Sequence, residues 1–463
     1  MGRSNKPSNH PTIQPPTTNH PTTNRRRRPP RADVGECARM GTGMTRAAWR
    51  MILLASLGGT LEYYDFVLFG IFAREIGAAV FPSQDPLVSL MVTFTTFAIG
   101  YLARPIGGIV LGRLGDRLGR RGVFLASIFV TSAATLGIGL VPTYASWGIA
   151  ASIVVVVLRL TQGFCLGGEL PGAITYVVES SPRMAPFVCS VVFACVTMGV
   201  ALATTIALVV GRVLSPAEAA LYGWRIAFVV GGIMGLGGFW LRQSFEESPE
   251  FVELQRLAAS SKEPIGELVR THPAQLVTGI AAQAVTASFA GLFFAHMPAY
   301  LAAVARYDPA TAVAAQTYGV VLHAVLILGA GMLANRYAPH LLLRAGALVL
   351  VAGAYPFYAA LSARSVPILL LMTLAALAGA LVNGTFAFVT ADLFPTRIRF
   401  SGVAVVQNIS QTAFGGTAPL VATALIRDLQ SPVAPALVVV ACGVMTFAGS
   451  FAAGRYGGRV RNT

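Results

Sequence analysis

The chain has 463 residues, of which 55% are hydrophobic and only 11% are charged. Because a soluble domain carries about 25% charged residues, most of this chain does not face water. The formal net charge of +15 does not indicate a nucleic-acid partner, because the Lys and Arg residues lie in a tail and between apolar runs and form no soluble basic face.

The N-terminal tail, residues 1–49, is predicted to be disordered and cytoplasmic. Residues 8–24 repeat Asn-His-Pro-Thr, and four arginines follow at 25–28. This polar composition cannot bury enough apolar surface to fold, and it lacks the apolar segment of a signal peptide. Two interpretations remain open: the tail contacts anionic lipid, or it precedes a native start at Met40 or Met44.

From residue 50 onward the chain consists of long apolar runs, for example Val196–Val210. Since a membrane-spanning helix needs roughly 20 apolar residues, there is material for about a dozen helices, whereas a β-barrel would show short segments of alternating polarity. The first half, 50–242, is predicted to span the membrane at 50–73, 88–112, 122–142, 147–178, 186–212 and 223–242. The second half, 273–454, is predicted to span it at 274–302, 312–335, 341–361, 365–390, 399–426 and 432–454. A polar loop at 243–272 joins the halves, and a short cytoplasmic tail follows at 455–463.

The arginines in the loops predict the orientation of this all-α membrane protein. The loop after the second span holds four arginines between residues 113 and 121, whereas the loop after the ninth span holds only Arg364. Loops rich in Lys and Arg stay in the cytoplasm. Both termini are therefore predicted to lie there, in a multi-pass protein of the cell membrane.

Two short motifs recur with nearly the same offset. Gly112–Arg117 returns as Gly331–Arg336, and Glu179–Pro182 returns as Asp392–Pro395, at offsets of 219 and 213 residues. Each span of the first half therefore corresponds to the span six further on. Halves repeated in this way place a solute site between them, near the middle of the membrane.

Three ionisable residues inside apolar spans are candidates for proton coupling. Glu62 and Asp65 are three residues apart and share one helix face, roughly 18–22 Å from the cytoplasmic end of their span. Arg159 lies at a similar depth, so we expect the three to meet. Such a cluster can hold a proton in one state and release it in another. A static buried ion pair that fixes helix packing is the alternative.

Other polar residues in the spans are candidates for binding a solute. Arg104 could meet a carboxylate bidentately or extend toward the interface, and an anionic solute could compete with the acids for Arg159. Neutral side chains of the second half would supply hydrogen bonds. The candidate solute-binding residues are Arg104, Arg159, Tyr63, Gln162, Asn383, Asn408 and Gln411.

The ten residues from Gly112 to Arg121 resemble the cytoplasmic loop signature of the major facilitator superfamily. The resemblance implies that Asp116 locks the outward-facing state against a helix N-terminus of the other half, with Arg117 and Glu179 in the same relay. The copy in the second half has Asn335 in place of the acid. A role in topology and packing alone is the alternative. The candidate gating residues are Gly112, Asp116, Arg117, Gly119, Arg120, Arg121, Glu179, Asp392 and Arg397.

A narrower resemblance rests on five further stretches. Gly58–Phe66, Ala103–Gly108, Arg159–Glu169, Gly223–Arg225 and Asp392–Arg397 look like the metabolite:proton symporter family. The resemblance implies a major facilitator fold of 12 helices and uptake of carboxylates, aromatic acids or betaine- and proline-like zwitterions.

We therefore expect a secondary transporter that moves a small organic solute together with protons by alternating access. Alternatives are a solute sensor on the same fold or a sugar or drug transporter of the superfamily. An enzyme is not expected, because the spans contain no nucleophile–base pair, and the five cysteines lack metal-binding spacing. No cofactor, metal or nucleic acid is expected, and the protein is expected to be a monomer.

Overall fold

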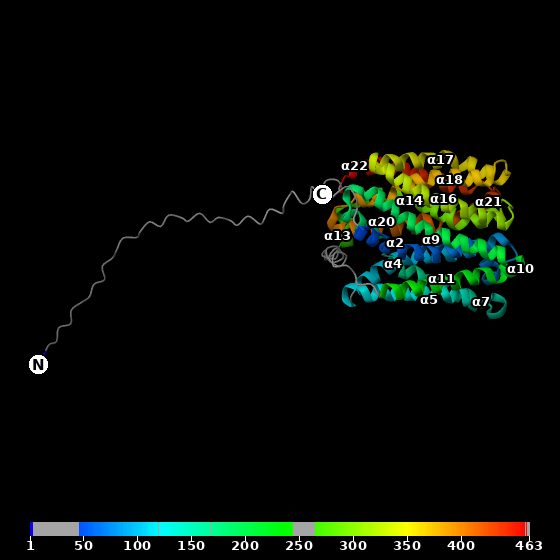
Figure 1. Cartoon of the computed structure of the whole chain (residues 1–463), viewed down its shortest axis with the longest axis horizontal. Helices are drawn as coiled ribbons and strands as arrows, with labels where there is room; N and C mark the ends of the chain where they lie inside the picture. Colours follow the sequence, from blue (N-terminus) through cyan, green and yellow to red (C-terminus); the bar gives the residue numbers. More distant parts are fainter. Residues whose placement is uncertain (3–45, 119, 168, 244–263, 459, 461–463) are drawn as a thin grey trace. The chain divides into compact units, whose positions relative to one another are not determined.

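The computed structural model describes residues 1–2, 46–118, 120–167, 169–243, 264–458 and 460. Ala47–Thr463 forms one compact unit, and all regular elements of its described part are helices that run side by side along the unit (Figure 1). The predicted all-α fold is confirmed. Most of the predicted N-terminal tail, and residues 244–263 of the predicted central loop, lie outside the described residues.

The helices of the first half follow the six predicted spans, with several spans divided into two elements. They are α2 (Arg46–Ile71), α3 (Ala73–Val80), α4 (Pro86–Leu118), α5 (Arg120–Leu140), α6 (Tyr144–Trp147), α7 (Ile149–Cys165), α8 (Glu169–Ser180), the 3₁₀ turn η1 (Pro182–Met184), α9 (Ala185–Val213), α10 (Pro216–Glu218), the π-helix η2 (Ala219–Gly223) and α11 (Trp224–Gln243). The first span extends beyond its predicted end at 73, because α3 continues it to Val80.

The second half begins with a short helix inside the predicted central loop. Its elements are α13 (Pro264–Thr271), α14 (Pro273–Phe289), the π-helix η3 (Ala290–His296), α15 (Met297–Ala303), α16 (Pro309–Arg336), α17 (Pro339–Ala363), α18 (Ile368–Asn383), α19 (Phe386–Asp392), α20 (Thr396–Ser410), the π-helix η4 (Gln411–Gly416), α21 (Ala418–Leu429) and α22 (Pro435–Tyr456). Local sequence explains such starts. In α16, for example, Asp308 accepts a hydrogen bond from the Thr311 amide at 3.0 Å, and Pro309 fills the first helical position.

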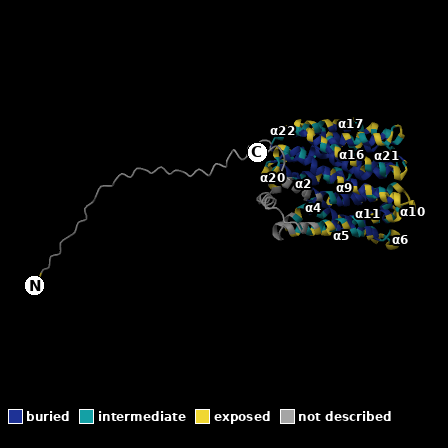
Figure 2. Ribbon diagram, viewed as in Figure 1, coloured by how far each residue is buried: buried dark blue, intermediate teal, exposed yellow. Residues whose placement is uncertain are grey.

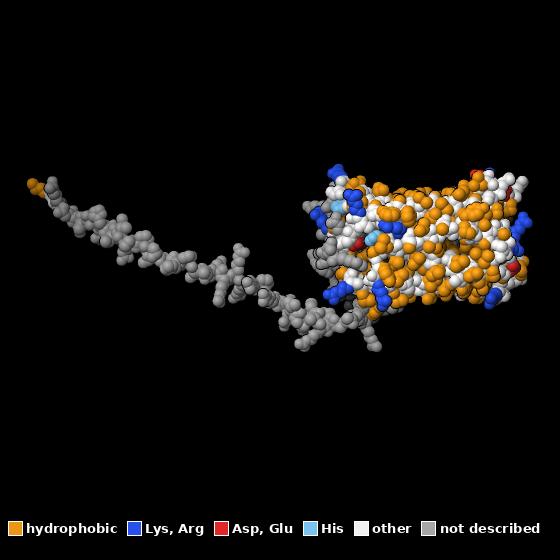
Figure 3. All heavy atoms as spheres, turned by 90° about the horizontal axis from the view of Figure 1, so that it is seen from above, with side chains coloured by type: hydrophobic (Ala, Val, Ile, Leu, Met, Phe, Trp, Pro, Cys, Tyr) orange, Lys and Arg blue, Asp and Glu red, His pale blue; other side chains and the backbone are white. Residues whose placement is uncertain are grey.

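The described residues contain ten helical segments that are long and apolar enough to cross a membrane. Leu125–Leu140 is a shorter apolar helix, and the 26-residue α2 supplies the first span, which together make twelve. Buried residues lie along the interior of the bundle (Figure 2). Hydrophobic side chains cover the flank that Figure 3 shows, and basic side chains gather near the two ends. This distribution fits a bilayer around the flank.

Glycines bring α4 and α7 into backbone contact and thereby position the charged residues of both helices. A Cβ atom on Gly163 of α7 would overlap the carbonyl oxygen of Gly100 on α4. A Cβ atom on Gly107 would likewise overlap the carbonyl oxygen of Phe164. Small residues allow this close approach in membranes. The packing brings Arg104 of α4 and Arg159 of α7 over the same ring, that of Phe66.

Candidate functional site

Glu62 forms a buried ion pair with Arg104. The distance from Glu62 Oε1 to Arg104 Nη2 is 2.9 Å, and the side chains are 2% and 5% exposed. The expected meeting of both acids with Arg159 is therefore replaced by two neighbouring sets of contacts, one for each acid. The rise per helical residue predicted that Glu62, Asp65 and Arg159 lie at one level of the membrane, but it did not specify which side chains face each other.

Asp65 is linked to Arg159 through two polar side chains. The Thr135 hydroxyl lies 3.0 Å from Asp65 Oδ2 and accepts a hydrogen bond of 2.7 Å from Gln162 Nε2. Arg159 Nη1 donates to Gln162 Oε1 at 3.0 Å. Four buried residues thus form a continuous chain from a carboxylate to a guanidinium. A change at either end can be transmitted to the other through these bonds.

Thr135 was not predicted from the sequence. Its hydroxyl also lies 3.0 Å from the Thr131 carbonyl of its own helix. Threonine hydroxyls in apolar helices commonly form such a hydrogen bond to the carbonyl four residues earlier. The sequence of α5 therefore carries no signal that distinguishes Thr135 from a residue that only bonds its own backbone.

Phe66 contacts both buried arginines. The guanidinium carbons of Arg104 and Arg159 lie 4.6 and 4.2 Å from the centroid of its ring. Arg159 also lies over Phe69, at 4.5 Å, and Arg104 over Tyr101, at 4.7 Å. These cation–π contacts hold both cations within an apolar environment.

Arg159 retains hydrogen-bonding capacity although the residue is 0% exposed. Its Nε and Nη2 atoms have no hydrogen-bond partner among the described residues. Buried donors without partners are costly, and this edge of a guanidinium is suited to bind a carboxylate through two parallel bonds. Arg159 is therefore a candidate site for an anionic group.

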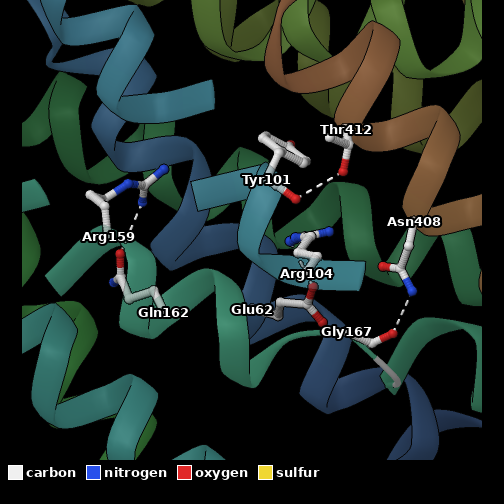
Figure 4. A network of polar contacts seen from close by, with 8 residues as sticks. All are labelled: Glu62, Tyr101, Arg104, Arg159, Gln162, Gly167, Asn408 and Thr412. Carbon is white, nitrogen blue, oxygen red and sulfur yellow. Dashed lines mark hydrogen bonds and ion pairs between the residues drawn. The ribbon is translucent and has the colours of Figure 1, made fainter. Parts of the chain in front are cut away.

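The neutral candidates of the second half have different surroundings. Asn383 bonds His323 at 2.9 Å. Asn408 donates to the Gly167 carbonyl of the first half at 2.7 Å (Figure 4). Gln411 is fully buried, and neither of its side-chain polar atoms has a hydrogen-bond partner within the described part of the chain. Tyr63, a neutral candidate of the first half, is buried on α2. Of these four, Gln411 keeps the most hydrogen-bonding capacity for a solute.

The predicted gating loop lies at the junction of α4 and α5. Gly119 and the side chains of Asp116, Arg117, Arg120 and Arg121 lie outside the described residues, so their expected roles stay predictions. The same holds for the role expected of Gly112, which lies in the last turns of α4.

Two contacts join the halves at the predicted cytoplasmic ends of the helices. Glu179 Oε1 lies 3.1 Å from Arg399 Nη1, so the acid expected in the relay pairs with a residue that was not among the predicted gating residues. Asn335 Oδ1 accepts a hydrogen bond of 3.3 Å from the Phe187 amide, near the N-terminus of α9. The neutral copy of the loop acid therefore still meets a helix N-terminus of the other half.

The two remaining gating candidates lie elsewhere. Asp392 accepts hydrogen bonds from the backbone amides of Gly458 and Val460, at 2.6 and 2.8 Å, and so binds the segment after α22. Arg397 is exposed near the start of α20.

An apolar groove of about 890 Å³ lies apart from these charges, between α4, α5 and α7. Several of its lining residues, including Leu102, Ile106 and Leu160, are exposed on the flank. The groove thus faces the surrounding bilayer and lacks the charged groups that a polar solute would need. Arg159 and Gln411 remain the better candidates for a solute site.

Comparison with known proteins agrees with this architecture. A family model described as the Major Facilitator Superfamily matches residues 37–419. The chain is 28% identical to a proline/betaine transporter of Salmonella typhimurium over 435 residues, which cover 89% of this chain and 85% of the relative. It is 29% identical to a proline/betaine transporter of Escherichia coli over 419 residues, which cover 86% and 82%.

Solved structures share the fold. The structure of a D-xylose-proton symporter superimposes with a TM-score of 0.69 at 18% identity and covers 90% of this chain and 99% of that chain. An inward-facing bacterial homolog of the human lysosomal transporter Spinster superimposes with a TM-score of 0.60 at 17% identity, over 89% and 98%. The predicted 12-helix fold is confirmed.

Proposed function

Because the chain belongs to the major facilitator superfamily, it is a multi-pass membrane transporter and not an enzyme, and we propose that it moves a small zwitterionic solute together with protons. The named activity of the relatives supports a proline- or betaine-like solute. The two halves, 50–242 and 273–454, rock about a site near the middle of the membrane and expose it to each side in turn.

The solute carboxylate binds Arg159. The observation that carries this assignment is the buried guanidinium edge, Nε and Nη2, that has no hydrogen-bond partner among the described residues. Gln411 of the second half, whose buried side-chain amide has no hydrogen-bond partner in the described part of the chain, supplies a further hydrogen bond. A solute held in this way contacts both halves, so its binding favours the state in which they close around it.

The proton binds Asp65. The bonded chain through Thr135 and Gln162 connects this carboxylate to Arg159. When a solute carboxylate approaches Arg159, the guanidinium interacts less with Asp65, which then binds a proton more readily. Solute and proton consequently load together, and the halves switch when both or neither are bound. The Glu62–Arg104 pair stabilises the packing of α2 against α4.

Exchange of solute across liposomes tests the assignment. The purified chain should exchange radiolabelled L-proline or glycine betaine in counterflow, and Arg159→Gln should abolish the exchange. Arg344→Gln is the matched control, because Arg344 is also a helix arginine stacked on an aromatic ring, Phe451, at 3.5 Å. Unchanged exchange by Arg159→Gln would overturn the carboxylate site. Binding without exchange by the unmodified chain would favour a sensor.

We also propose that the protein works as a monomer in the plasma membrane with both termini in the cytoplasm. The arginine-rich loops support this orientation. Ser83 is exposed between α3 and α4, on the proposed outer side. A cysteine introduced there should react with a membrane-impermeant maleimide added to intact cells, and reaction only after lysis would contradict the orientation.

A further inference from the structure

Two backbone carbonyls of the first half lie where the regular helical hydrogen-bond pattern is interrupted. In an α-helix, each carbonyl accepts a hydrogen bond from the amide four residues later, and proline has no such amide. Tyr101 precedes Pro105 by four residues, inside α4. Gly167 lies between the end of α7 at Cys165 and the start of α8 at Glu169, so its carbonyl belongs to neither helix. Both carbonyl oxygens are therefore available to other donors.

The second half supplies a donor to each of these carbonyls. The Thr412 hydroxyl donates to the Tyr101 carbonyl at 2.8 Å, and Asn408 Nδ2 donates to the Gly167 carbonyl at 2.7 Å. Both donors come from the same span, at the end of α20 and in η4, and they meet the first half beside Arg104 (Figure 4). Each donor bonds a carbonyl outside the regular helical pattern, because Pro105 removes the amide partner of the Tyr101 carbonyl and the Gly167 carbonyl lies between α7 and α8.

The surroundings make these two bonds important for the contact between the halves. Asn408 is buried, and Gly416 of η4 packs so closely on Tyr101 that a Cβ atom would lie 2.6 Å from its ring. In an apolar interior, a carbonyl that loses its partner has no water to replace it. Separation of the halves at this level therefore requires that both bonds break.

The halves also touch at both ends of the bundle. Glu179 and Arg399 form an ion pair at one end. At the other end, Ala299 of the second half packs in an apolar cluster with Leu90 and Phe94 of the first half. The described contacts are those of a closed state, with the Asn408 and Thr412 bonds between the two ends.

We propose that Asn408 and Thr412 are positioning residues of the transport cycle, which stabilise the closed state by bonding the Gly167 carbonyl between α7 and α8 and the Tyr101 carbonyl that Pro105 leaves open. This inference rests on the alternating access proposed above. Each turnover passes through the closed state, so weakening it slows the switch between the open states without removing a group that binds solute. Asn408 thereby affects transport through its bond to the first half and not through a contact with the solute.

Transport kinetics in liposomes test the proposal. Thr412→Val removes the donor and keeps the shape, and Asn408→Ala removes the other donor. Since one hydrogen bond is lost in each, we expect turnover of L-proline to fall about five-fold while its binding constant stays within about two-fold. Thr417→Val is the matched control, because the Thr417 hydroxyl bonds the Ala413 carbonyl of its own segment at 2.6 Å. Wild-type turnover in Thr412→Val would overturn the role of that bond.

A second variant tests the proline directly. In Pro105→Ala, the new amide of residue 105 can donate to the Tyr101 carbonyl. This carbonyl then no longer depends on the Thr412 hydroxyl for a hydrogen bond. Adding Thr412→Val to Pro105→Ala should then reduce turnover by less than about two-fold. The difference between this reduction and the reduction that Thr412→Val causes in the wild-type chain measures the coupling between Pro105 and Thr412. An equal loss in both backgrounds would overturn the proline mechanism. The two Thr412→Val proteins should elute as folded monomers, which separates the effect from misfolding.

A distance measurement separates failure of this inference from failure of the transport proposal. Spin labels at the exposed Ser83 and Gln430, one in each half, report whether these ends are together or apart. The ratio of short to long distances should fall about five-fold in Thr412→Val, even if neither L-proline nor glycine betaine is transported. Transport by the unmodified chain together with unchanged distances in Thr412→Val would overturn the inference alone.

Discussion

Glu62 and Arg104 form an ion pair of 2.9 Å inside the bundle and join α2 to α4. Breaking a buried pair by removing one partner leaves an uncompensated charge, whereas replacing both partners by apolar residues of similar size costs much less. The main effect of the pair on stability is therefore the destabilisation that follows when one of the two residues is removed.

We predict that Glu62→Leu lowers the stability of the purified protein by roughly 3–5 kcal/mol, because it leaves the Arg104 charge buried and unpaired. The double variant Glu62→Leu with Arg104→Met should recover most of this loss. Thermal unfolding in detergent measures both. A double variant that is as unstable as the single one would show that the ion pair itself is needed for packing.

Asp65→Asn should uncouple solute from protons. The amide keeps the size of the carboxylate and can still bond Thr135, but it cannot exchange a proton at this site. Counterflow of L-proline should persist, whereas proton entry driven by a proline gradient should vanish, and uptake should lose its dependence on external pH. A pH-sensitive dye inside the liposomes measures the proton. Asp85→Asn, at the exposed start of α4, is the control, and proton entry that survives Asp65→Asn would assign coupling elsewhere.

Gly163→Ala should separate α4 from α7. The added Cβ atom would overlap the carbonyl oxygen of Gly100, and backbone cannot move aside as a side chain can. We expect destabilisation by at least about 1–3 kcal/mol and a loss of transport, because Arg159 lies one turn away. Gly329→Ala in α16 is the matched control, since its Cβ atom would meet nothing within 4 Å. Equal thermal stability of the two variants would contradict the close packing.

Asn335→Asp should strengthen the contact between the halves at the end that we propose to be cytoplasmic. Asn335 accepts a bond from the Phe187 amide near the N-terminus of α9, and a negative charge there is favoured by the helix dipole by about 0.3–1 kcal/mol. Spin labels at Arg183 and Tyr337, which are exposed on the two halves, should report more of the short distance. Asn335→Leu should shift the distances the other way, and a shift in the same direction by both variants would contradict this role.

Much of the architecture could be predicted from the sequence. Long apolar runs and polar loops are properties of consecutive residues, so they predicted the twelve spans and the division into two halves. The depth of Glu62, Asp65 and Arg159 was also accessible, because each helical residue adds about 1.5 Å along the axis. The loop motif from Gly112 to Arg121 indicated the correct superfamily, because it is a property of consecutive residues.

The pairing within the site was decided only by the tertiary structure. Depth along an axis does not say which faces of two helices meet, and that depends on where glycines such as Gly100 and Gly163 allow the backbones to touch. Glu62 therefore joined Arg104, and Thr135 entered the chain between Asp65 and Arg159 without a signal of its own. Sequence by itself determined the spans and the charges they carry, because burial in a bilayer acts on each segment separately. Only the folded bundle decided the partners, because they come from segments far apart in the chain and meet through packing.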